Sequence, residues 1–389
     1  MIKMPMTLKS RCTIAIVVPA VALAPETARD AAIIGDPRND DNVIVSQLHA
    51  SLARIHNLWM QRGVDRGEPW MEAFERVCRE MRRHYQWIVL NDFLPRLTGP
   101  KVVGETLPAG ADPAAERFRG RIFPLSLTPA IPVEFSVAAL RVGHAMVRDA
   151  YVLNERFAQM GPMELFSPDE TAPDLRGGRY LPAGWEVDWR WFLPIDPAVR
   201  PQSSQTIGPR IAPALSRLPG LDPSNLALRT LRRGQAYGLP AGQAVAETMG
   251  ETPVRPSRRD PLWLYVLYEA EELHGGRCMG PVGGRIVAEV IIGLLAADPQ
   301  SYVNAEPGWT PSEGVRDLGS LLALAAGGAP SLGPIPITGH SDLGPSWHDL
   351  NIPNRNEFGP IEIAVDRDGS RKIRRYDRNT VVSSPGVRL

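Results

Sequence analysis

Apolar residues recur every three or four positions over several long segments of the chain, and this spacing predicts a mainly helical protein. The first helix is expected from Asn42 to Gly63, with Gly63 as a C-cap. The second opens with Pro69 near its first turn and is expected to end at Pro95. Four further helices are predicted, at about Val133–Asn154, Pro240–Met249, Pro261–His274 and Val282–Ala296.

Strand signals are confined to the end of the chain. Residues Ile361–Val365 alternate in polarity, Asp368-Gly369 suits a turn, and Lys372–Tyr376 alternates again, which predicts a hairpin. The apolar run Ile286–Leu295 is too short for a membrane span and is expected to be a buried helix. The expected fold class is therefore mainly α, a multi-helix domain with little β structure.

Three regions are expected along the chain: a variable extension at 1–30, a helical domain at 31–350, and a tail with the hairpin at 351–389. Basic residues precede the apolar run Cys12–Ala24, which is typical of a secretory signal, although Pro19 interrupts the run. The compartment stays open: cytoplasmic, or secreted or periplasmic if residues 1–24 act as a signal.

Charge and cysteine content exclude several classes of protein. The 43 basic and 43 acidic residues balance, so no general field attracts nucleic acid. Three scattered cysteines, with no CxxC pair, form neither a disulfide framework nor a zinc site. We expect no nucleic-acid partner and no membrane span, and the oligomeric state stays open.

The segment FSVAALRVGH at 135–144 holds the most informative pattern. On a helix, Arg141 and His144 are three residues apart and share a face, and Gly143 would let a flat group approach the backbone. A neutral imidazole is a good ligand for haem iron, and burial beside an arginine disfavours the imidazolium. Spacing alone also fits the alternative, a histidine satisfied within the core.

A second segment, GDPRNDDN at 35–42, places Arg38 among several carboxylates before a long helix. The structural interpretation is a helix N-terminus, with Asn42 as the cap and acidic residues near the positive end of the helix dipole.

Six stretches in order resemble the animal haem peroxidase superfamily, which includes myeloperoxidase, peroxinectin, prostaglandin H synthase and bacterial members. They are GDPRNDDN (35–42), QLHASLARIHN (47–57), QWIVLNDFLPRL (86–97), FSVAALRVGHAMV (135–147), LRRGQAYGLPAGQ (231–243) and EAEELHGGRCMGPVGGRIVAEV (269–290). This resemblance implies a haem peroxidase-like helical domain with haem b as the cofactor.

The resemblance also implies roles for individual residues. His144 matches the proximal iron ligand, and Arg141 matches the arginine that pairs with a haem propionate. Arg38 matches the catalytic arginine that polarises bound peroxide, and Asp41 falls where some members carry a glutamate esterified to haem. Thr230 stands where the family usually has an asparagine bonded to the proximal histidine, so the bond is expected to be weaker here.

One part of the family pattern is not found. The resemblance places a distal histidine and a calcium-binding loop upstream of the GDPR-like stretch, yet the 34 residues before Gly35 contain no histidine. We therefore expect the distal base and the calcium site to be missing, through truncation or through a weakened activity, since a positioned base assists cleavage of peroxide.

The function expected from the resemblance is reduction of peroxide with oxidation of a small organic or halide donor. Two alternatives stay open. One is a fatty-acid dioxygenase of the cyclooxygenase type, for which Tyr151 and Tyr237 are the candidate radical residues. The other is a non-catalytic protein that keeps the fold to bind a partner. His49 and His56, seven apart on one helix, are expected to be structural rather than metal ligands.

Overall fold

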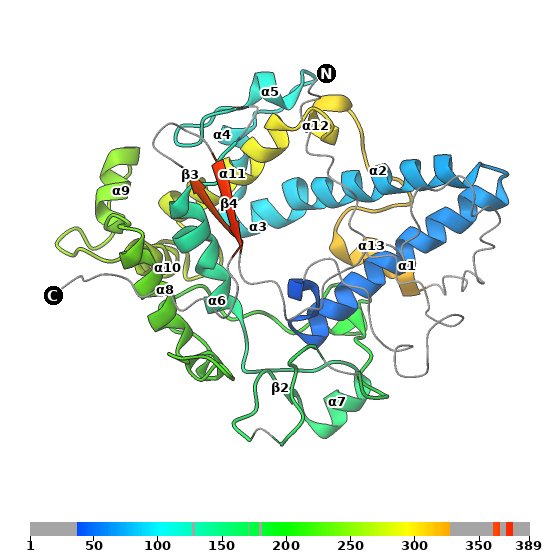
Figure 1. The fold of residues 1–389 in the computed structure, drawn as a ribbon, viewed down its shortest axis with the longest axis horizontal. Helices are drawn as coiled ribbons and strands as arrows, with labels where there is room; N and C mark the ends of the chain where they lie inside the picture. Colours follow the sequence, from blue (N-terminus) through cyan, green and yellow to red (C-terminus); the bar gives the residue numbers. More distant parts are fainter. Residues whose placement is uncertain are drawn as a thin grey trace. The chain divides into compact units, whose positions relative to one another are not determined.

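The computed structural model describes residues 37–126, 129–169, 171–178 and 181–326 together with two strands near the C-terminus. The chain divides into two compact units, Met1–Leu332 and Gly333–Leu389, and each is described by itself (Figure 1). The signal-like run at 12–24 and the Gly35-Asp36 pair lie outside the described residues.

The first unit is built almost entirely from helices, which confirms the predicted mainly α fold class. Its longer helices are α1 (Val43–Asp65), α2 (Trp70–Ile88), α8 (Leu226–Ala236), α9 (Gly242–Met249), α10 (Leu262–His274), α11 (Pro281–Ala297) and α13 (Leu318–Ala326). The shorter ones are α3 (Leu94–Thr98), α4 (Pro100–Thr106), α5 (Ala114–Arg117), α6 (Gly143–Met146), α7 (Glu155–Met160) and α12 (Tyr302–Ala305). The described helices include none that is long and apolar enough to cross a bilayer.

Helix α1 begins where the sequence predicts and ends later. The Asn42 side chain accepts a hydrogen bond from the backbone N–H of Ile44 at 2.8 Å, as an N-cap does. The predicted C-cap at Gly63 is wrong, because the helix continues to Asp65. Gly63 is needed for close packing instead: a Cβ there would lie 2.7 Å from atoms of both Glu68 and Arg76.

Helix α2 packs along α1, as the two blue helices in Figure 1 show, and α13 packs against α1 as well. The prediction that this helix ends at Pro95 is wrong. A π-helical segment, η3 (Val89–Phe93), follows α2 and leads into α3, where Pro95 occupies the first turn. In a regular α-helix, a proline clashes with the carbonyl group four residues earlier and has no N–H to donate to it. The wider π-turn accommodates both effects, so the chain stays helical to Thr98.

Helices α10 and α11 form the centre of the largest apolar cluster. The run Ile286–Leu295 lies within α11, and most of this helix is buried, as predicted. The N-terminus of α11 is capped by the buried carboxylate of Glu269, which accepts hydrogen bonds from the N–H groups of Val282 and Gly283, both at 3.1 Å.

The predicted helix at 133–154 is wrong in both length and type. The segment is a π-helix, η4 (Glu134–Ala138), then a 3-10 helix, η5 (Ala139–Val142), then α6, which ends at Met146. Beyond it, strand β1 (Ala150–Tyr151) pairs antiparallel with β2 (Met163–Glu164). Asp149 also accepts a hydrogen bond from the backbone N–H of Ala214 at 2.8 Å, so contacts with distant segments replace the last helical turns.

Helices α8 and α13 were not predicted from the sequence. The second unit contains strands β3 (Ile361–Val365) and β4 (Arg371–Arg375), which pair antiparallel. This confirms the predicted hairpin, with the second strand one residue earlier than expected.

Candidate active site around His144

The short segment η5–α6 has one buried face and one open face. Small apolar residues, namely Ala138, Ala139, Val142 and Ala145, are buried against the core. Leu140 and Gly143 are exposed and His144 is half-buried beside them. We call these three residues the open face. Leu140 is 42 % exposed, so the open face has apolar surface next to the half-buried imidazole.

Gly143 leaves room above the open face. A Cβ built on Gly143 would meet no atom of the described residues within 4 Å. Its backbone is right-handed helical, with φ −54° and ψ −27°, so the glycine is not required by its conformation. Because Gly143 has no side chain, its backbone is accessible from the open face.

The hydrogen bonds of Thr230 define the state of the imidazole. Thr230, on α8, donates its hydroxyl proton to the carbonyl oxygen of Leu226 at 2.9 Å. Toward His144 Nδ1, which lies 3.5 Å away, the same hydroxyl oxygen can therefore act only as an acceptor. Nδ1 therefore carries the ring proton and donates it. Nε2 then has a free lone pair, and it makes no hydrogen bond to any residue in the described part of the chain.

The environment also keeps this imidazole neutral. Burial, together with the smaller effects of the charges of Arg141 and Arg233, lowers the pKa of His144 from 6.5 to about 4. A neutral ring with an unprotonated outer nitrogen is the form that coordinates a metal ion.

Trp263, on α10, supports the segment from its buried side. Its indole N–H donates to the carbonyl oxygen of Arg141 at 3.1 Å, and its ring lies edge-on to His144 with centroids 6.2 Å apart. The sequence analysis missed this residue. The only available signal was a tryptophan on a strongly apolar helix, and a buried indole usually needs an acceptor.

The animal haem peroxidase family profile matches residues 8–170. This range includes Arg38, Asp41, Arg141 and His144. Over this range the chain is similar to the animal haem peroxidase family.

Two curated relatives agree with this similarity. One is the "Peroxidase-like protein" of Margaritifera margaritifera, 32% identical over 121 residues, which are 30% of this chain and 14% of that protein. The other is the "Thyroid peroxidase" of Canis lupus familiaris, 25% identical over 229 residues, which are 56% of this chain and 22% of that protein. The aligned part thus spans less than a quarter of either relative.

Arg141 and Arg233 are two cations whose charges act on His144. Arg141 donates from Nε to the carbonyl oxygen of Ser136 at 3.0 Å, and burial and the charge of Arg233 both lower the pKa of Arg141. Neither arginine forms an ion pair with a carboxylate of the described residues. The sequence analysis missed Arg233, because α8 itself was not predicted.

Arg38 and Asp41 belong to a different group, at the start of α1. Arg38 lies in a 3-10 turn, η2 (Pro37–Asp40), and both side chains are exposed. The backbone there is held by residues 175–177: Val43 donates to Leu175 at 2.9 Å and Gly177 donates to Asp41 at 3.0 Å. The structure therefore groups His144, Arg141 and Thr230, whereas the backbone of Asp41 bonds to Gly177.

The other candidate residues, His56, Tyr151 and Tyr237, lie apart from the open face. His56 is buried with its Nε2 3.9 Å from the sulfur of Cys78, between α1 and α2. The hydroxyl of Tyr151 accepts from the backbone N–H of Arg148 at 3.0 Å, and Tyr237 is 60% exposed after α8. Among the described residues, no three His, Cys, Asp or Glu side chains are grouped as a bare metal ion would require. A haem iron needs only one such ligand.

Proposed function

We propose that this chain binds haem b on the open face, with His144 Nε2 as the iron ligand, and uses it to reduce peroxide at the expense of a small organic or halide donor. The observation that carries the proposal is the state of His144. Its inner nitrogen is bonded to Thr230, its outer nitrogen is free, and the space over Gly143 is open. The donor set thus fits a haem, which requires a neutral imidazole beside an apolar surface.

The two arginines beside His144 fit the acidic edge of such a cofactor. Haem carries carboxylates, and Arg141 and Arg233 are close enough that their charges disfavour one another. A propionate between them would offset this repulsion and form charge-assisted hydrogen bonds. We infer that Arg141 and Arg233 orient the haem, and that Thr230 and Trp263 orient His144.

We propose that Arg38 would act on bound peroxide and that Asp41 would attach the haem, as the resemblance of the segment 35–42 implies. Arg38 stays protonated at any relevant pH, so it can stabilise negative charge on a peroxide oxygen but cannot move a proton. Asp41 would attach the haem as an ester, in which a carboxyl oxygen replaces one hydrogen of a haem methyl group and peroxide accepts the two electrons and is reduced to water. When bound, the haem supplies the electron transfer; peroxide gains two electrons and two protons to give water, and two donor molecules lose one electron each.

Haem titration of the purified full chain tests the proposal. We expect a saturable Soret band, and we expect His144→Ala to weaken haem binding by more than about a hundredfold, the upper end of what loss of an outer-shell partner costs. His274→Ala, a half-exposed histidine in the last turn of α10, is the matched control and should bind haem as the original chain does.

A second variant separates ligation from folding. In His144→Gly, added imidazole should restore the Soret spectrum and the peroxide-dependent oxidation of a phenol. If His144→Ala and the original chain bind haem with equal affinity, His144 is not the iron ligand. A chain with no saturable haem binding would instead favour the non-catalytic alternative.

A further inference from the structure

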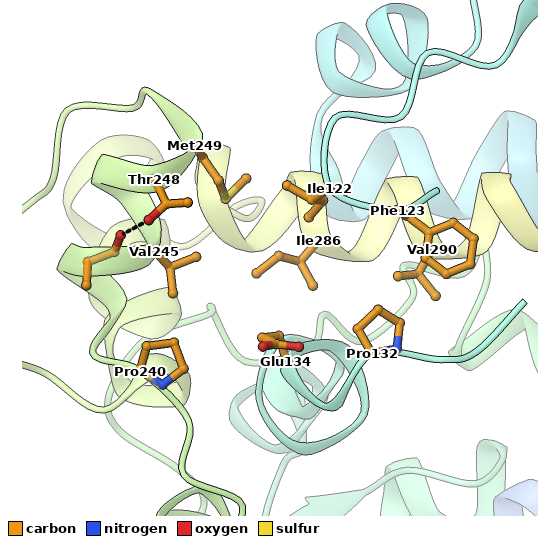
Figure 2. Close-up of a pocket in the computed structure, with 11 residues that line it drawn as sticks. Ile122, Phe123, Pro132, Glu134, Pro240, Val245, Thr248, Met249, Ile286 and Val290 are labelled. Atoms are coloured by element: carbon orange, nitrogen blue, oxygen red, sulfur yellow. Dashed lines mark hydrogen bonds between the residues drawn. The ribbon is translucent and has the colours of Figure 1, made fainter. Parts of the chain in front are cut away.

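A separate cavity of about 320 Å³ lies at the other end of the segment that carries His144, around the first turn of η4. Its walls come from η4, α9, α11 and the loop that contains Ile122 and Phe123. Figure 2 shows these walls facing one another across the cavity, with Val245 on one side and Phe123 on the other. The lining is mostly aliphatic, so the cavity favours an apolar occupant.

The loop that forms one wall is held rigidly. The buried carboxylate of Glu289 accepts hydrogen bonds from the backbone N–H groups of Ile122 at 2.8 Å and Phe123 at 3.2 Å. The ring of Phe123 lies over Gly293, where a Cβ would come within 2.3 Å of it. The same Glu289 pairs with Arg285 at 3.5 Å, so its charge is already neutralised within the wall. The cavity is therefore preformed, which lowers the entropic cost of binding a small molecule.

One charged residue, Glu134, lies on the lining. In Figure 2 its carboxylate stands between Pro132 and Pro240, facing the same space as Ile286. It forms no hydrogen bond or ion pair with the residues that the structure describes.

We propose that this cavity binds a small amphiphilic amine, with the apolar body between α9 and α11 and the primary ammonium group paired with Glu134. A cavity of about 150 Å³ holds benzene, so this one holds an apolar body about twice that size. The ammonium would donate a charge-assisted hydrogen bond to a carboxylate that has no side-chain partner among the described residues. A carboxylic acid would be repelled, and a neutral molecule would cover the carboxylate without pairing it.

Calorimetric titration of the full chain without added haem tests the amine site independently of the proposed peroxidase activity. The probes are n-hexylamine, 1-hexanol and hexanoate, each of which has six carbons in a straight chain. We expect hexylamine to bind about tenfold more tightly than hexanol, as one charge-assisted hydrogen bond provides, and hexanoate to bind more weakly than either.

Two variants and a matched control locate the site. Glu134→Gln should remove the preference for hexylamine and leave hexanol binding unchanged. Glu155→Gln, an exposed glutamate in the first turn of α7, should keep the preference. Ala244→Leu narrows the cavity from α9 and should weaken both probes. Equal affinity for hexylamine and hexanol, an unchanged preference in Glu134→Gln, or no saturable binding would each overturn the proposal.

Discussion

Replacement of Thr230 by valine isolates the hydrogen bond that defines the His144 tautomer. Valine has nearly the same shape but no hydroxyl, so the Nδ1–H of His144 loses its acceptor. The contact is 3.5 Å long, whereas the same hydroxyl donates to Leu226 at only 2.9 Å. The lost interaction is therefore at the weak end for a hydrogen bond, about 0.5–1 kcal/mol, which corresponds to a haem affinity about two- to fivefold lower.

The measurement combines haem titration with nitrogen NMR of the His144 ring in the chain without haem. The original chain should show the Nδ1-protonated form, and Thr230→Val should populate both neutral tautomers. Thr230→Ser keeps the hydroxyl and is the matched control, so it should retain both the tautomer and the affinity. If valine leaves the tautomer and the haem affinity unchanged, Thr230 does not orient the ligand and the reasoning about Nε2 fails.

Two further predictions test the open face and the core behind it. Gly143→Val should leave the thermal unfolding temperature nearly unchanged, because the new Cβ enters open space from a helical backbone. It should nevertheless weaken haem binding by more than about tenfold, because the valine side chain would contact the haem. Equal haem affinity of the two chains would place the haem elsewhere. Burial raises the pKa of Glu269 from 4.5 to about 7, so the folded chain holds a proton that the unfolded chain releases, and stability falls as pH rises through this window. The free energy of unfolding of the original chain relative to Glu269→Gln should therefore fall by about 2 kcal/mol between pH 5 and pH 8 in urea titrations, and a difference independent of pH would contradict this assignment.

The sequence by itself determined the fold class and the best-patterned elements. The dense apolar run of α11 favours burial, so its position and its bounds were predictable within a residue or two. Asn42 was predictable as a cap for a similar reason, since its side chain bonds to a backbone group only two residues away. The alternating pattern of the terminal hairpin is local in the same sense.

Only the tertiary structure decided the elements whose partners are distant in sequence. The segment of His144 ends at Met146 because Asp149 and strand β1 find partners more than ten residues away, which no periodicity can indicate. Pro95 does not end its helix, because a π-turn accommodates it.

In the candidate site too, local patterns were predictable and contacts between distant segments were not. A histidine three residues after an arginine, with a glycine between them, was visible in the sequence. The hydrogen bond of Trp263 to this segment and the effect of the Arg233 charge on His144 were not visible, since α10 and α8 lie some 90 to 120 positions later in the chain. The physical reason is that side-chain spacing encodes which face of an element is apolar, whereas packing between elements decides which polar groups meet there.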